Sequence, residues 1–77
     1  MTETLLDVQG LTCPLPVLKA NKVLRGLPDG ATLRVLATDP ASMADFRAYC
    51  SETGHELLEA AQEGAVFRYA LRKRVAP

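Results

Sequence analysis

Hydrophobic and polar residues alternate in four segments of the chain and recur at helical spacing in two others. Alternation places successive side chains on opposite faces of a strand, so we predict strands over residues 5–9, 31–38, 55–62 and 65–73. Apolar residues spaced three or four apart predict a helix over residues 14–27. A second helix should open at Asp39-Pro40, with Asp39 as N-cap and Pro40 at the first helical position, and should stop at Gly54.

This order of elements, βαβαββ, predicts an α/β two-layer sandwich. A right-handed crossover would make the first two strands parallel, and a turn at Glu63-Gly64 would join the last two as a hairpin. The result is a four-stranded mixed sheet with two helices on one face and the other face open. With only 77 residues, the chain should form a single domain, residues 1–77.

The composition narrows the classes of function. The chain is 48% hydrophobic and 23% charged, and its nine basic and nine acidic residues cancel, so no global attraction to nucleic acid or to an anionic membrane is expected. No apolar run approaches the roughly 20 residues that cross a bilayer. The N-terminal residues lack the basic and apolar regions of a signal peptide, so we expect a cytoplasmic protein that is not bound to membranes.

The segment Gly-Leu-Thr-Cys-Pro-Leu-Pro, residues 10–16, joins the first strand to the first helix and carries the candidate chemistry. Gly10 supplies the positive φ that a sharp turn requires, and Pro14 suits the first turn of a helix. Cys13 is therefore expected at or near the N-cap, where unsatisfied N–H groups and the helix dipole favour the nucleophilic thiolate. A carboxylate from Asp39, or from Asp7, would act in the opposite direction and raise the pKa of the thiol.

The second cysteine and the one histidine are expected to be structural. Cys50 continues the apolar stripe of the second helix with Met43 and Phe46, which indicates a buried side chain. Cys50 should lie too far along that helix to form a disulfide with Cys13. His55 follows the helix-ending Gly54 and is expected to be a capping or surface residue. Two cysteines and one histidine fall short of a structural metal site, so no metal and no bound cofactor are expected.

The motif around the first cysteine resembles the Cys-Pro-x-Pro signature of the TusA/SirA-like sulfur carrier family, most closely its TusA group. The matching positions are Asp7, Gly10, Leu11, Cys13, Pro14 and Pro16. The segments Thr38-Asp39-Pro40, with Asp45 downstream, and residues 67–73 resemble other parts of the family, so that the resemblance covers essentially the whole chain.

The resemblance implies that Cys13 carries a persulfide. It implies a sulfur carrier that takes sulfane sulfur from a cysteine desulfurase or similar donor and relays it to a downstream acceptor protein, for example for tRNA 2-thiouridine formation. Molybdenum cofactor supply and sulfur oxidation are other outcomes known in the family. Gly10, Leu11, Pro14 and Pro16 would support the motif. Such a carrier acts stoichiometrically, as a monomer, within a sulfurtransferase relay rather than as a stand-alone enzyme.

Basic residues near the motif helix and in the last strand offer a docking surface for these partners, although a solvated helix face would look the same. They are Lys19, Lys22, Arg25, Arg68, Arg72, Lys73 and Arg74. Two other functions remain open. A regulatory or RNA-binding module is disfavoured by the neutral charge and the 5% aromatic content, and a thiol peroxidase or oxidoreductase by the lack of a resolving cysteine.

Overall fold

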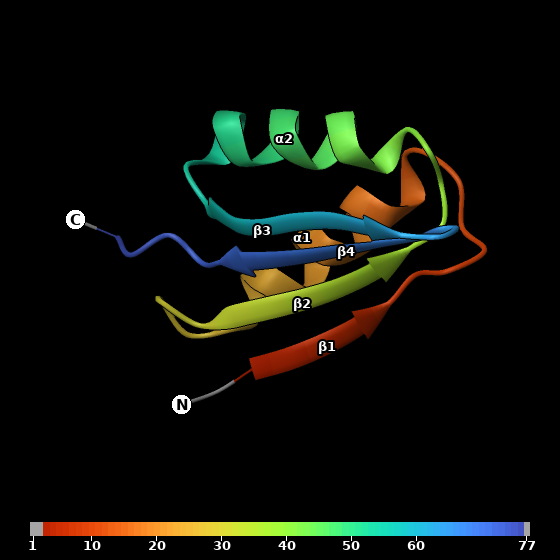
Figure 1. Cartoon of the computed structure of the whole chain (residues 1–77). Helices are drawn as coiled ribbons and strands as arrows, with labels where there is room; N and C mark the ends of the chain where they lie inside the picture. Colours follow the sequence, from red (N-terminus) through yellow and green to blue (C-terminus); the bar gives the residue numbers. More distant parts are fainter. Residues whose placement is uncertain (1–2, 77) are drawn as a thin grey trace.

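Strands and helices alternate in the computed structural model in the order expected from the sequence (Figure 1). The elements are β1 (Glu3–Asp7), α1 (Leu15–Arg25), β2 (Thr32–Ala37), α2 (Ser42–Thr53), β3 (Glu56–Glu63) and β4 (Val66–Arg72). The structure describes residues 3–76, so Met1, Thr2 and Pro77 of the expected domain lie outside the described residues. Neither helix in that range has the length and the hydrophobicity that crossing a membrane requires.

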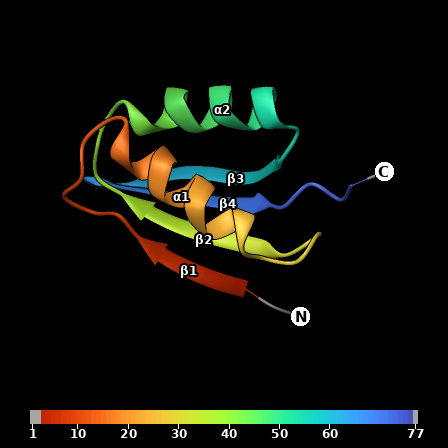
Figure 2. The same ribbon diagram turned by 180° about the vertical axis from the view of Figure 1, so that it is seen from behind.

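The sheet has the strand order β1-β2-β4-β3, and both helices cover one of its faces (Figure 2). β1 and β2 are parallel, as the right-handed crossover predicts, whereas β4 is antiparallel to both β2 and β3. The predicted α/β sandwich with a mixed four-stranded sheet is therefore confirmed. Parallel pairing also means that β1 and β2 both end at the same edge of the sheet.

The core lies between the sheet and the two helices, and its members follow the predicted periodicities. Alternate residues of β2 and β4 point inward, and the buried face of α1 is formed by Pro16, Ala20 and Leu24, four residues apart. Phe46 of α2 stacks on Tyr69 of β4 with 4.6 Å between the ring centroids. The other buried apolar residues of this core are Val8, Leu33, Val35, Ala37, Tyr49, Cys50, Phe67 and Leu71.

The predicted start of the second helix is wrong. Asp39 is not its N-cap and Pro40 is not its first residue, because α2 begins at Ser42 with Ala41 in the cap position. The Asp39 carboxylate accepts a hydrogen bond from the N–H of Ala41 (3.2 Å), and the Asp39 carbonyl accepts one from the N–H of Ser42 (3.0 Å). These bonds form a separate turn ahead of the helix.

Two glycines end their elements as expected, with one shift in position. Gly54 terminates α2 with a left-handed φ of 83°, and its N–H donates to the carbonyl of Cys50 (2.9 Å). The hairpin between β3 and β4 turns at Gly64 and Ala65, one residue later than predicted, with Gly64 at a φ of 59°. β3 also contains an irregularity between Leu57 and Glu59, which the alternation pattern did not reveal.

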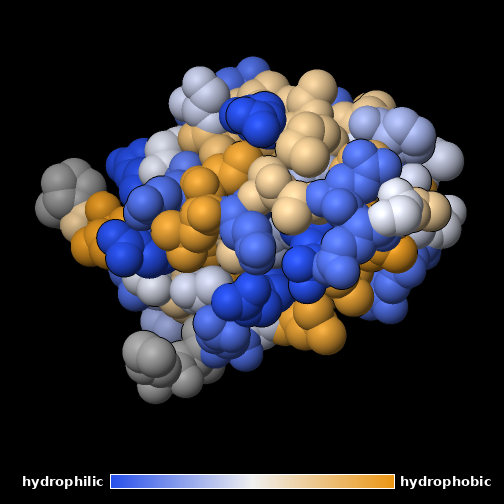
Figure 3. Space-filling model, in the orientation of Figure 1, coloured by the Kyte–Doolittle hydropathy of each residue, from blue (hydrophilic) through white to orange (hydrophobic). Residues whose placement is uncertain are grey.

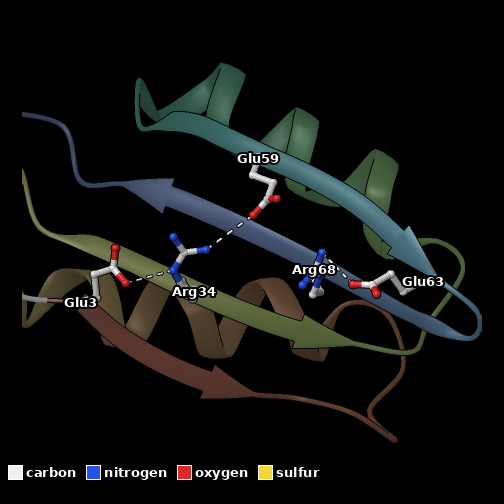
Figure 4. A network of polar contacts seen from close by, with 5 residues as sticks. All are labelled: Glu3, Arg34, Glu59, Glu63 and Arg68. Atoms are coloured by element: carbon white, nitrogen blue, oxygen red, sulfur yellow. Dashed lines mark hydrogen bonds and ion pairs between the residues drawn. The ribbon is translucent and has the colours of Figure 1, made fainter.

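The sheet face opposite the helices carries ion pairs rather than a continuous apolar surface. Arg34 of β2 contacts Glu3 of the neighbouring β1 (3.0 Å) and, across β4, Glu59 of β3 (3.5 Å), and Arg68 contacts Glu63 (Figure 4). In Figure 3, which shows this face, hydrophilic residues separate the hydrophobic ones. Exposed pairs of this kind contribute little stability, so the fold depends on the helix-covered face.

Two leucines of α1 test which face holds the fold together. Leu24 is fully buried, whereas Leu18 is 55% exposed. Leu24→Ala should lower the free energy of unfolding by about 2–5 kcal/mol, because it removes buried methyl groups and leaves a cavity. Leu18→Ala, the same substitution in the same helix, should change it by less than about 0.5 kcal/mol. Urea denaturation of both variants measures the difference, and equal losses would contradict the assigned packing of α1.

Candidate functional site

The candidate site forms where the loops that follow β1 and β2 meet at one edge of the sheet (right side of Figure 1). The first loop contains Cys13 and the second contains Asp39. The N–H of Cys13 donates a hydrogen bond to Asp39 Oδ2 (2.7 Å), and the N–H of Gly10 donates one to Thr38 Oγ1 (2.8 Å). Side chains of the second loop therefore fix the backbone of the first.

The motif residues divide between anchoring the loop and exposing the thiol. Gly10 has a φ of 83°, as predicted, and Leu11 packs its half-buried side chain against the core. Pro16, in the first turn of α1, is buried on the core-facing side of that helix. Between these anchors, Cys13 and Pro14 are exposed, and the peptide bond that joins them is cis. The support assigned to Gly10, Leu11 and Pro16 is consistent with these positions.

Cys13 lies ahead of the helix cap rather than at it. α1 begins at Leu15, Pro14 occupies the cap position, and no side chain caps the helix. The backbone N–H of Cys13 is directed to Asp39 and not to the helix. The thiol is thus near the N-terminus of α1 without being the capping group.

Two carboxylates surround the Cys13 thiol. Sγ of Cys13 and one carboxylate oxygen each of Asp39 and Asp45 lie within 4.8 Å of one another, a spacing that would also let the three side chains hold a metal ion. Asp45 belongs to the first turn of α2. A buried hydrogen bond between Ser42 Oγ and Tyr69 Oη (2.6 Å) anchors that turn to β4. The core thereby positions Asp45 beside the thiol.

These carboxylates oppose ionisation of the thiol. A hydrogen bond to Asp45 raises the pKa of Cys13, and the negative charges of Asp45 and Asp39 raise it further. The sequence left open whether the helix end or a nearby carboxylate would dominate, and the pKa of the thiol is raised, the direction expected of a carboxylate. Asp39 acts as anticipated, but the second carboxylate is Asp45 and not Asp7, whose Oδ1 accepts a hydrogen bond from the N–H of Gln9 (3.0 Å).

The position of Asp45 beside the thiol was not predicted from the sequence. Asp45, Tyr49 and Glu52 recur at helical spacing along one side of α2, and all three lie within the predicted helix as well. All three line a shallow groove of about 220 Å³ that leads away from Cys13. This spacing was visible in the sequence and could have indicated a face turned toward the cysteine.

The second cysteine and the histidine have the structural positions expected of them. Cys50 is buried in α2, burial raises the pKa of its thiol, and both cysteines are free. His55 lies beyond the C-terminal end of α2, whereas Asp45 and Cys13 lie near its N-terminal end. Its Nδ1 accepts a hydrogen bond from the N–H of Arg74 (2.9 Å), and burial lowers its pKa.

The basic residues considered for docking do not form one surface. Lys19, Lys22 and Arg25 are exposed on α1. Arg68 and Arg72 lie on the open sheet face, where they pair with Glu63 (2.6 Å) and Glu56 (3.4 Å).

The last two basic residues bind backbone carbonyl groups. Lys73 donates through Nζ to the carbonyl of Leu27, and Arg74 donates to the carbonyl of Thr53 (3.4 Å). A docking role for these residues stays a prediction. Of the set, Lys19, Lys22 and Arg25 lie on the helix-covered side of the molecule, where the candidate site is.

Removing the Asp45 charge tests the electrostatics of the site. Asp45→Asn should lower the pKa of the Cys13 thiol, because it takes away the strongest of the interactions that oppose ionisation. More thiolate would then be present at pH 7, and iodoacetamide should alkylate Cys13 several-fold faster than in the parent chain. Glu56→Gln, on the open sheet face, is the matched control and should leave the rate unchanged. A slower or equal rate in Asp45→Asn would contradict the assignment.

Comparisons with known proteins agree with the sequence motif. The model of the sulfurtransferase TusA family matches residues 4–73. The chain is 47% identical to the sulfur carrier protein TusA of Allochromatium vinosum over 68 residues, which cover 88% of this chain and 90% of the relative. It is 39% identical over 72 residues to TusA of Pseudomonas putida, covering 94% and 90%. A SirA-like protein from Desulfitobacterium hafniense shares the fold, with a TM-score of 0.81 at 22% identity over 96% of this chain and 100% of the other. The chain therefore belongs to the TusA family.

Proposed function

We propose that this protein carries sulfane sulfur as a persulfide on Cys13. The observation that carries the proposal is an exposed thiol on the Cys-Pro-x-Pro loop, within a fold that anchors the residues on both sides of it. The 47% identity to a sulfur carrier protein supports the same role. The donor is a cysteine desulfurase or similar protein, and the acceptor is a further thiol protein, with tRNA 2-thiouridine formation as one end use in the cytoplasm.

Loading is a thiol exchange without net oxidation. The Cys13 thiolate attacks the outer sulfur of the donor persulfide, a new S–S bond forms on Cys13, and the S–S bond of the donor breaks. The electron pair of the broken bond leaves with the inner donor sulfur as a thiolate, and the proton from Cys13 passes to solvent. Unloading repeats the exchange with the acceptor thiolate as the attacking group and Cys13 as the leaving group.

The site suits a carrier because it exposes the sulfur while lacking the other parts of a thiol enzyme. Among the described residues, Cys50 is buried and His55 lies at the other end of α2, so neither a resolving thiol nor a histidine accompanies Cys13. Both exchange partners must then bring their own reactive groups. No cofactor is required by this chemistry, and one molecule of carrier moves one sulfur per encounter.

An RNA-binding module is the alternative, and the sheet offers little support for it. Phe67 and Tyr69 point into the core, so they provide no stacking surface on the open face. The arginines of that face, Arg34, Arg68 and Arg72, are each paired with glutamates. Loss of tRNA thiolation without direct tRNA affinity would distinguish the carrier from such a module.

The test is the intact mass of the protein after incubation with a cysteine desulfurase and cysteine. A gain of one sulfur, removed by dithiothreitol, is expected in the parent chain and in Cys50→Ser, because Cys50 is buried. It should be absent in Cys13→Ser. No gain in any form, with an active desulfurase from the same organism, would overturn the proposal. Direct tRNA binding in a gel-shift assay would then favour the alternative.

A further inference from the structure

A groove between the two helices starts at the candidate sulfur-carrying thiol. Its volume is about 220 Å³, and it is open to solvent along its length. It is lined by Cys13, Pro14 and Val17 from the start of α1, and by Asp45, Ala48, Tyr49 and Glu52 from α2. Val17, Ala48 and the Tyr49 ring give it an apolar lining. The groove is therefore shaped for one or two side chains of a segment that brings its own sulfur to Cys13.

The charged side chains that line this groove are acidic, and they form no ion pair within residues 3–76, although the charge of Arg25 in α1 reaches Tyr49. Asp45 and Glu52 line it, and Asp39 lies at its Cys13 end. Every ion pair within residues 3–76 lies instead on the open sheet face, where Glu3, Glu56, Glu59 and Glu63 contact arginines. The molecule thus neutralises the acidic groups of one face internally and leaves those beside its thiol available to a partner.

We propose that the groove binds a cationic loop of the sulfur donor, with a lysine or arginine against Asp45 and Glu52 and the donor's persulfide at Cys13. This inference rests on the proposed carrier function and specifies the partner's chemistry. An apolar side chain of the same loop would pack on Val17 and Tyr49, and charge complementarity would align it.

The cation would also prepare Cys13 for the exchange. Asp39 and Asp45 oppose ionisation of the thiol in the free protein, and a positive charge placed beside them offsets their effect. The thiolate would then form mainly in the complex. Anionic disulfides of the surrounding solution, which the same carboxylates repel, would react slowly with the free carrier.

Small charged disulfides test the inference without any desulfurase. The probes are cystamine, which is cationic, 3,3′-dithiodipropionate, which is anionic, and 2-hydroxyethyl disulfide, which is neutral. Rate constants for the mixed disulfide at Cys13 are measured by intact mass and divided by those of 2-mercaptoethanol with the same probe. When the corrected rate constants of two probes are divided for the same protein, the fraction of Cys13 present as thiolate cancels. The ratio therefore reports the local charge alone.

Cystamine should react about tenfold faster than 3,3′-dithiodipropionate after this correction, with the neutral probe between them. The preference should shrink several-fold in 0.5 M NaCl, about the range where screening is strong, and in the double variant Asp45→Asn/Glu52→Gln. Ala48→Lys, which places a cation at an exposed position of the groove, should reverse it. Glu56→Gln is the control and should retain the full preference.

A ratio near one in the parent chain, or one unchanged by salt and by the double variant, would overturn the inference. The salt measurement needs no substitution, so it stands even where a variant fails to fold. A cation preference together with failed persulfide loading would keep the groove assignment and remove the carrier function. Successful loading without a cation preference would keep the carrier function and remove the groove assignment.

Discussion

The parallel pairing of β1 with β2 is the constraint on which the rest of the site depends. It brings the loops after both strands to one edge of the sheet, although 26 residues separate Cys13 from Asp39. There the Asp39 carboxylate accepts hydrogen bonds from the N–H groups of Cys13 and of Ala41, so a single side chain joins the two loops and shapes the turn before α2. An antiparallel β2 would end at the opposite edge and leave Cys13 on an unsupported loop.

The same arrangement explains how the Cys13 thiol can be exposed while its ionisation is opposed. Protein thiols that act alone as nucleophiles are usually activated by positive surroundings. Cys13 lies instead beside two carboxylates that raise its pKa, one from the connecting loop and one from the helix that Ser42 and Tyr69 anchor. Such a thiol is suited to reaction inside a complex, where the partner supplies what the free chain lacks. The neutral overall charge of the chain is consistent with this, because attraction would come from the local groove rather than from the whole molecule.

Most of the fold could be predicted from the sequence because periodicity reports local geometry. Alternation in β2 and β4, the three- and four-residue spacing of apolar residues in α1 and the glycines at Gly10 and Gly54 all specify local conformations, and the predicted strands, helix and turns occur in the structure, with α1 shorter than the predicted range of residues 14–27. The Cys-Pro-x-Pro motif was sufficient to indicate the family. The start of α2 was wrong because Asp-Pro is a good helix opening in isolation, whereas here the Asp39 side chain is bonded across to Cys13 and to Ala41. The approach of Asp45 to Cys13, and with it the direction of the pKa shift of the thiol, could not be predicted because it depends on contacts between distant segments.

The central claim, that Cys13 both accepts and surrenders sulfur, is tested most directly by following labelled sulfur through one full transfer. The protein is loaded with ³⁵S from labelled cysteine, freed of the donor, and added to an extract of the source cells, which supplies the acceptor proteins. If Cys13 carries sulfur, the label leaves Cys13 for a protein persulfide and then for a macromolecular product, while the carrier returns to the free thiol. Label that stays on Cys13, or that appears only as free sulfide at the rate given by small thiols alone, would contradict it.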